Sequence, residues 1–227
     1  MGAKVLHETG LPVMPHIACR DKNAIALRAG LLGAYVNGIR NFLVVTGDPV
    51  AGGDRGDITG VFDFNSITLM QFLKEMNQEH FREEPICYGG ALNQGRKNLD
   101  AEIRRMGKKI EAGTSYFLTQ PIFSIEETER IRQIKKELNT RILCGIMPLV
   151  SYRNACFIRN EVTGIQVPEQ VVRSFDPGMS KEQGEEAGVR IARRMMDELK
   201  DVADGYYFML PFNRAYLAAR CLRDDGE

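Results

Sequence analysis

The sequence of 227 residues lacks tryptophan and has only three histidines and five widely spaced cysteines, none of them in a Cys-x-x-Cys pair. We therefore expect neither a disulfide-stapled scaffold nor a zinc site, and we expect reduced thiols. No apolar run approaches the roughly 20 residues that a membrane-spanning helix needs. Thirty basic and thirty acidic residues cancel, so the charge indicates no nucleic-acid or membrane partner. Together these absences favour a cytoplasmic protein.

What is present is a regular alternation of short apolar runs and longer charged segments with helical periodicity. Apolar side chains make up 44% of the chain, enough for a large core. The apolar runs predict strands at 15–19, 42–46, 86–89, 116–119, 142–147 and 206–210. The periodic segments predict helices at 24–36, 66–79, 99–112, 124–138 and 181–199. This order is typical of an α/β fold in which helices connect parallel strands.

Polar residues recur where the predicted strands end, and many such ends meeting at one site favour a TIM (β/α)8 barrel over a doubly wound sheet. We predict a single barrel domain over residues 1–227. Six strands are two fewer than a closed barrel needs. The sequence thus predicts a barrel without its first two strands, either because the chain is a fragment or because a partner completes the sheet.

Asp48 follows the buried strand Phe42–Val45 and is a site candidate, although a loop aspartate can also be a turn residue or a helix cap. The glycine-rich loop that continues from Gly47 to Gly60 matches neither a P-loop nor a dinucleotide-binding fingerprint. It predicts either a long mobile loop or a loop that approaches a large ligand closely.

Three further residues have two interpretations each. His16 lies in an apolar strand and is either a core histidine or a ligand contact. Gln120 ends a strand, where its amide could either stabilise a loop or bind the edge of an amide-like heterocycle. Lys109 lies near the end of a helix, where the helix dipole favours a cation, and it could also bind phosphate.

Several segments together resemble the methylenetetrahydrofolate reductase family, in the family's order and spacing, over residues 11–222. They are PHIACRD, NGIRNFLVVTGDP, EIRRMGKKIEAG followed by YFLTQPIF, GIMPLVS and FMLPFNR. The wording of TGDP, TQP and FMLPFNR is closest to the branch in which this domain follows a homocysteine S-methyltransferase domain.

The resemblance implies a TIM barrel that binds FAD and reduces 5,10-methylenetetrahydrofolate to 5-methyltetrahydrofolate. This reaction belongs to one-carbon metabolism, tetrahydrofolate interconversion and methionine biosynthesis. NADH or NADPH would be the electron donor, and a ferredoxin-coupled donor stays open. A fused or associated homocysteine S-methyltransferase and a homo-oligomer are further expectations.

The resemblance also implies roles for single residues around the Gly-Asp motif. Asp48 would lie beside the flavin N1 and the pterin, where its carboxylate opposes negative charge on the reduced flavin and so tunes its potential. Thr46 and Gly47, which precede Asp48, would contact the cofactor, and Gln120 would contact the folate. Many relatives have Arg-Gly-Asp here, so Thr46 means that one cationic FAD contact is absent or replaced.

The FAD ribose–phosphate portion would contact His16 and Lys109, and Glu102 matches an acidic FAD-contacting position. The family's general-acid glutamate, in a Glu-Phe-Phe-Pro-like strand, has no match in this sequence. General acid–base catalysis typically contributes about 10²–10⁴-fold, so an impaired reductase is expected. The alternatives are a non-catalytic flavin- or folate-binding remnant, a subunit completed by a partner, or another TIM-barrel pterin enzyme such as a methyltransferase.

Overall fold

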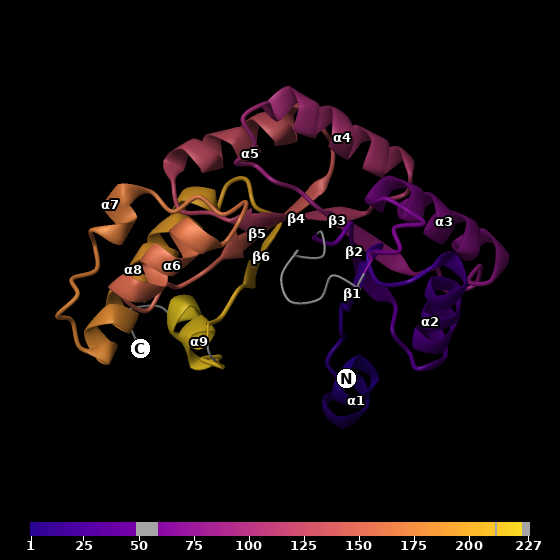
Figure 1. The fold of residues 1–227 in the computed structure, drawn as a ribbon, viewed down its shortest axis with the longest axis horizontal. Coiled ribbons are helices and arrows are strands. Elements are labelled where there is room, and N and C mark those ends of the chain that lie inside the picture. The colour runs from indigo at the N-terminus through magenta and orange to yellow at the C-terminus, as the bar shows by residue number, and fades with distance from the viewer. Residues whose placement is uncertain (49–58, 212, 224–227) are drawn as a thin grey trace. The chain divides into compact units, whose positions relative to one another are not determined.

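The computed structural model describes residues 1–48, 59–211 and 213–223. Its strands are β1 (His16–Ala18), β2 (Asn41–Val45), β3 (Cys87–Ala91), β4 (Tyr116–Pro121), β5 (Arg141–Ile146) and β6 (Gly205–Phe208). Its helices are α1 (Gly2–Thr9), α2 (Ala24–Val36), α3 (Ser66–Glu79), α4 (Leu99–Glu111), α5 (Ile125–Glu137), α6 (Tyr152–Glu161), α7 (Glu169–Val172), α8 (Lys181–Leu199) and α9 (Tyr216–Leu222) (Figure 1).

The six strands form one sheet in the order β1-β2-β3-β4-β5-β6. The pairs β1–β2, β2–β3 and β5–β6 are parallel, with His16 opposite Leu43 in the first pair. A doubly wound sheet reverses its strand order at a switch point, whereas a barrel adds each strand beside the previous one. The observed order therefore confirms the predicted α/β fold of the TIM-barrel type.

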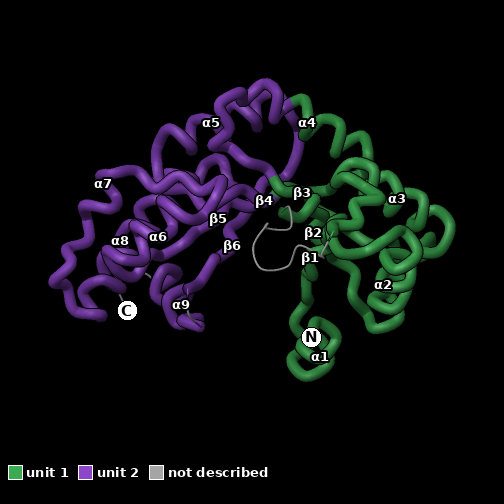
Figure 2. The backbone as a smooth tube through the Cα atoms, viewed as in Figure 1, with its two compact units in different colours: residues 1–91, 104–117 green, residues 92–103, 118–227 purple. Residues whose placement is uncertain are grey.

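Packing separates the chain into two compact units (Figure 2). Unit 1 comprises residues 1–91 and 104–117, and unit 2 comprises residues 92–103 and 118–227. In the part of the chain that the structure describes, no helix is long and apolar enough to cross a membrane.

The core of unit 1 lies between β2 and the helices α2 and α3. On α3 the residues Leu69, Leu73 and Met76 are completely buried, because their spacing of three and four places them on one face. Asn65 caps this helix by accepting hydrogen bonds from the backbone of Ile67 and Thr68. The prediction for 66–79 is confirmed to the residue.

Unit 2 has its own core, formed around α6, α7, α8 and the segments between them. Helix α8 approaches the end of β5 so closely that a Cβ at Gly188 would overlap the Leu149 carbonyl, and one at Gly184 would overlap that of Val150. Only glycine allows this approach.

Some local predictions differ from the structure. On α2, the apolar side chain of Ile25 is 79% exposed, although the apolar pattern that predicts this helix includes it together with Leu27 and Leu31, which are buried. Ser151, which follows a predicted strand, accepts a hydrogen bond from the Asn154 backbone as the N-cap of the unpredicted helix α6. The free thiols of Cys19 and Cys144 are buried, which raises the pKa of Cys19 to about 11 and keeps it protonated, in agreement with a packing role.

Candidate functional site

In unit 1, charged residues gather after the neighbouring strands β1 and β2. Arg20 follows β1 and donates from Nη1 to the backbone oxygen of Asp48, which follows β2, at 3.3 Å. Its Nε also donates to Asp21 Oδ1 at 2.6 Å, and this bond holds the pKa of the Asp21 carboxyl below its usual range. The guanidinium thus connects the carboxyl ends of two parallel strands, the edge at which barrel enzymes bind ligands.

Gly47 is required by the backbone geometry of this edge. Its φ of +85° lies in the left-handed region, which residues with a side chain rarely adopt. A Cβ at this position would also lie 3.0 Å from the Cβ of Arg20. The turn therefore holds the backbone of Asp48 beside Arg20.

Asp48 itself is exposed, and it contributes its backbone oxygen rather than its carboxylate to the contact with Arg20. The preceding Thr46 is half-buried. The carboxylate of Asp48 is thus open to a ligand at the strand end. Residues 49–58 of the glycine-rich loop, and with them the prediction that this loop approaches a large ligand, lie outside the described residues.

His16 is exposed at the first position of β1, so the interpretation as a buried core histidine is wrong. Its neighbour across the strand pair is Leu43, five residues before Asp48. At about 3.3 Å per residue, this register separates the two positions by up to roughly 16 Å along the strands. Only a long ligand could contact both side chains.

Lys109 lies in α4 and is 97% buried within unit 1, with 3% of its surface exposed. Its Nζ donates to the carbonyl oxygen of Ala91, the last residue of β3, at 2.6 Å. It also lies 5.9 Å from the centre of the Phe117 ring. The side chain thus extends from the last turn of its helix to a strand end, which the helix dipole alone would not require.

Glu102, also in α4, has a buried carboxylate in unit 2. Its Oε1 accepts from the backbone N–H of Asn93 at 3.1 Å, and Arg96 Nε lies 3.4 Å from Oε2. Among the described residues, Oε2 has no hydrogen-bond partner. A buried carboxylate oxygen that has an ion pair but accepts no hydrogen bond is uncommon, and it suits a hydroxyl or amine of a ligand.

Gln120 lies near the end of β4, which continues two residues beyond its predicted limit. Its backbone N–H donates to Gln94 Oε1 at 3.1 Å, and its backbone oxygen accepts from Gln94 Nε2 at 3.2 Å. Its half-buried side-chain amide forms no hydrogen bond with another described residue. The predicted loop-stabilising role of that amide is therefore not observed, and the amide is available to a ligand.

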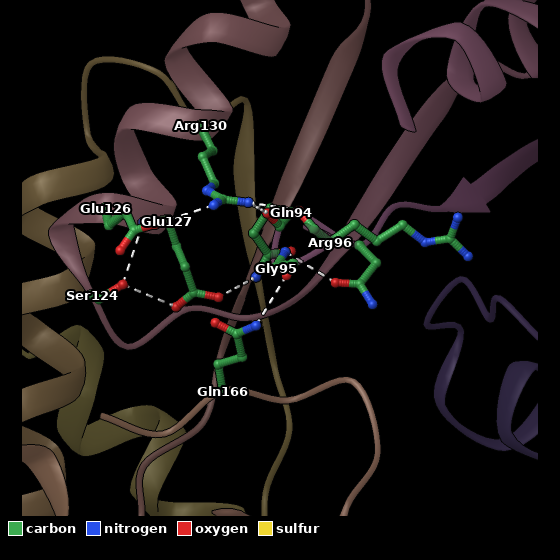
Figure 3. Close-up of polar contacts among 9 residues, drawn as sticks. Gln94, Gly95, Arg96, Ser124, Glu126, Glu127, Arg130 and Gln166 are labelled. Atoms are coloured by element: carbon green, nitrogen blue, oxygen red, sulfur yellow. Dashed lines mark hydrogen bonds and ion pairs between the residues drawn. The ribbon is translucent and has the colours of Figure 1, made fainter. Parts of the chain in front are cut away.

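Two residues of this region, Gln94 and Glu127, are absent from the sequence prediction. Gln94 is completely buried and donates from Nε2 to Glu127 Oε1 at 2.9 Å (Figure 3). Glu127 is buried as well, and burial raises the pKa of its carboxyl above the ordinary value. Its Oε2 accepts from the Phe123 backbone at 3.0 Å and from Ser124 Oγ at 3.4 Å.

The sequence contains one signal for Glu127. The Ser-Ile-Glu-Glu start of 124–127 predicts a helix N-terminus, and Ser124 Oγ indeed accepts from the Glu127 backbone at 3.3 Å. In a capping box the carboxylate would bond back to the backbone of the cap residue, whereas here it bonds to Phe123 and Gln94. The pattern located the helix start but not the buried contact.

The backbone of residues 94–96 is held by side chains from two other segments (Figure 3). Arg130 Nη1 on α5 donates to the carbonyl oxygens of Gln94 at 3.1 Å and Arg96 at 2.7 Å. Gln166 Nε2 donates to the Gly95 oxygen at 2.9 Å. These hydrogen bonds connect the segment to two other segments of unit 2.

Unit 2 also has a cleft of about 860 Å³ between the start of α5 and the helices α7 and α8. Its lining includes the ion pair of Arg159 with Glu169, but none of the predicted site residues. In the described part of the chain, no group of three or more histidine, cysteine, aspartate or glutamate side chains could hold a metal ion.

The strand order and the polar side chains at the strand ends define an α/β protein of the TIM-barrel type, with candidate ligand contacts after β2 and near the end of β4. The sequence profile of the methylenetetrahydrofolate reductase family matches residues 1–223, and the chain belongs to this family of oxidoreductases.

Individual relatives agree with this assignment. The chain is 26% identical over 216 residues to the 5,10-methylenetetrahydrofolate reductase of Escherichia coli, covering 92% of this chain and 69% of the relative. It is 27% identical over 221 residues to the enzyme of the same name from Pectobacterium carotovorum, covering 94% and 70%. Among solved structures, a protein from Clostridium thermocellum that binds two copies of 5-methyl-5,6,7,8-tetrahydrofolic acid has a TM-score of 0.52 at 14% identity, covering 97% of this chain and 96% of that one. This last similarity concerns the fold.

Proposed function

We propose that the chain is the FAD-binding barrel of an oxidoreductase that reduces 5,10-methylenetetrahydrofolate to 5-methyltetrahydrofolate with a nicotinamide donor. The observation that carries the proposal is the family match over residues 1–223, which includes all seven predicted site residues. The names of the bacterial relatives support the substrate. The folate bound by the Clostridium thermocellum protein supports a folate site on this fold.

The side chains fit FAD in their chemistry. Glu102 offers a buried Oε2 that pairs with Arg96 but accepts no hydrogen bond among the described residues, which suits a ribose hydroxyl. Lys109 holds its ammonium at the end of β3, which suits a phosphate oxygen. The exposed imidazole of His16 is a third contact for the ribose–phosphate portion. When bound, the flavin would supply the hydride that reduces the folate carbon.

Asp48 and Gln120 would act at the reacting end. The Asp48 carboxylate carries negative charge at an exposed strand end and would disfavour additional negative charge beside it, which lowers the reduction potential of a neighbouring flavin. The Gln120 amide can donate and accept at once and would fix the orientation of the pterin. Without a Glu-Phe-Phe-Pro-like match we assign no general acid, and we propose that this chain alone turns over slowly.

A second candidate function is a folate- or flavin-binding protein without reductase activity, or a subunit that a partner completes. The folate bound by the Clostridium thermocellum protein supports the binding part of this candidate, on a fold that matches this chain over 96% of that protein's length.

Product analysis separates the two functions. The purified chain is incubated without oxygen with FAD, 5,10-methylenetetrahydrofolate and either NADH, NADPH or a reduced ferredoxin. Formation of 5-methyltetrahydrofolate by one of the donors supports the reductase and identifies the donor. Binding of FAD and 5-methyltetrahydrofolate without product in any of the three reactions would replace the reductase by the binding protein.

A further inference from the structure

We propose that Gln94 is a positioning residue for Gln120 and that Glu127 sets the orientation of the Gln94 amide. The proposal rests on the proposed function, in which Gln120 contacts the folate. It assigns a role to two buried polar residues that the resemblance to the family leaves without one.

The side chain of Gln94 holds the backbone of Gln120 on both sides of its Cα atom. Gln94 Oε1 accepts from the Gln120 N–H at 3.1 Å, and Gln94 Nε2 donates to the Gln120 oxygen at 3.2 Å. The same oxygen accepts from Thr119 Oγ1 at 2.7 Å. Because the backbone N–H and the backbone oxygen of Gln120 are both fixed, the direction in which its side chain leaves β4 is fixed as well.

Glu127 determines which end of the Gln94 amide faces which partner. An ionised carboxylate only accepts hydrogen bonds, so the nitrogen of the amide must face Glu127 Oε1, at 2.9 Å. The amide oxygen is then left for the Gln120 N–H. Glu127 is itself held by donors from Phe123 and Ser124 at Oε2, so the orientation does not depend on a mobile group.

A purely structural role would be to anchor the segment 94–96, but other side chains already do this. Arg130 binds the carbonyl oxygens of Gln94 and Arg96, and Gln166 binds that of Gly95. The side chain of Gln94 is completely buried, and among the described residues it forms hydrogen bonds only with Gln120 and Glu127. Its contacts thus point to the folate-binding residue rather than to its own loop.

The test measures binding of 5-methyltetrahydrofolate to the full chain by titration calorimetry, together with flavin content and the KM and kcat for the folate. Gln94→Leu keeps the size of the side chain but removes its hydrogen bonds. We expect about tenfold weaker folate binding and a raised folate KM, with unchanged flavin content, because Gln120 loses its fixed orientation. Tyr206→Phe is the matched control, since it removes a hydrogen bond from Tyr206 to the Met196 oxygen elsewhere in unit 2.

An exchange of the two side chains keeps the test valid if Gln94→Leu does not fold. Gln94→Glu alone places two carboxylates against each other and should weaken folate binding at least as much. Adding Glu127→Gln restores an acceptor for the Gln120 N–H and a donor between the two side chains, although not the donor to the Gln120 oxygen, and should return part of the affinity.

Wild-type folate affinity in a folded Gln94→Leu variant, or an exchange that restores nothing, overturns the positioning role. An equal loss of folate affinity in Tyr206→Phe would also overturn the positioning role, because it would show that any lost hydrogen bond in unit 2 weakens binding by lowering stability. Failure of the proposed function is a different result: the unmodified chain would then bind no folate at all.

Discussion

Two strand-end segments of this protein carry candidate ligand contacts in opposite ways. After β2, Asp48 is exposed, and its backbone oxygen accepts a hydrogen bond from Arg20. After β3, Gln94 is completely buried and bonded to Glu127 and to the backbone of Gln120. In our proposal, the first segment presents its charge directly to a ligand, whereas the second fixes Gln120, the residue that would contact the folate. Substitutions in the segment after β2 should change the rate of folate reduction but not the stability of the fold. Substitutions in the segment after β3 should change both.

The largest effect is expected for Glu127→Ala. The change leaves the buried Phe123 N–H without its side-chain acceptor and removes one of the two acceptors of Gln94 Nε2, which should lower the free energy of unfolding by about 2 kcal/mol. Urea denaturation followed by circular dichroism measures it. Glu126→Ala is the control, because that carboxylate is exposed and its pair with Arg130 should contribute less than about 1 kcal/mol. Equal losses in the two variants would show that the buried contact is not special.

Asp48→Asn should slow folate reduction by about tenfold, the effect of ~1.4 kcal/mol on the barrier, and should shift the flavin reduction potential. Because Asp48 is exposed, the urea midpoint should stay within the range of a surface substitution, about 0.5 kcal/mol. Stopped-flow kinetics and a potential measured against a reference dye provide the two readouts. Unchanged rate and potential would remove Asp48 from the site.

The pH dependence of stability should identify Glu127. Burial raises its pKa in the folded chain above the ordinary 4.5, so the native state holds the proton to higher pH than the unfolded state does. Its contribution to stability is therefore greatest below pH ~4.5 and decreases as pH rises through the folded pKa. Glu127→Gln does not titrate, so the stability of this variant relative to the unmodified chain should increase between pH 4.5 and 8. A difference that stays constant over this range would contradict the buried, titrating carboxyl.

The smallest effect is expected for His16→Ala, because this side chain is exposed and exposed substitutions change stability little. FAD should bind about threefold more weakly, and the urea midpoint should not change. Fluorescence titration of the flavin measures the affinity. A loss of stability would mean that the imidazole packs after all.

Much of the fold can be predicted from the sequence, because each strand is a short apolar run and α3 has a strict helical period. Helix α6 is missed because it buries only Ala155 and Ile158 and exposes Phe157, so its period is weak. The four-residue helix α7 is too short to have a period.

The candidate site divides in the same way. The exposed Asp48 and the strand-end Gln120 follow from local sequence, since each comes at or after an apolar run. The role of Gln94 does not follow from local sequence, because the segment Asn-Gln-Gly-Arg at 93–96 has the composition of a solvated loop. Its burial depends on Glu127, a residue 33 positions later that no local pattern connects to it. Fusion to a homocysteine S-methyltransferase and a homo-oligomeric state stay predictions.

The central claim is that this barrel passes a hydride from a flavin to a folate, and single-turnover reoxidation tests it most directly. The flavin-loaded chain is reduced without oxygen by its donor and mixed with 5,10-methylenetetrahydrofolate while the flavin absorbance is followed. The account predicts a return of the oxidised spectrum at a rate that saturates with folate, with 5-methyltetrahydrofolate formed in equal amount. A reduced flavin that the folate leaves unchanged would contradict it.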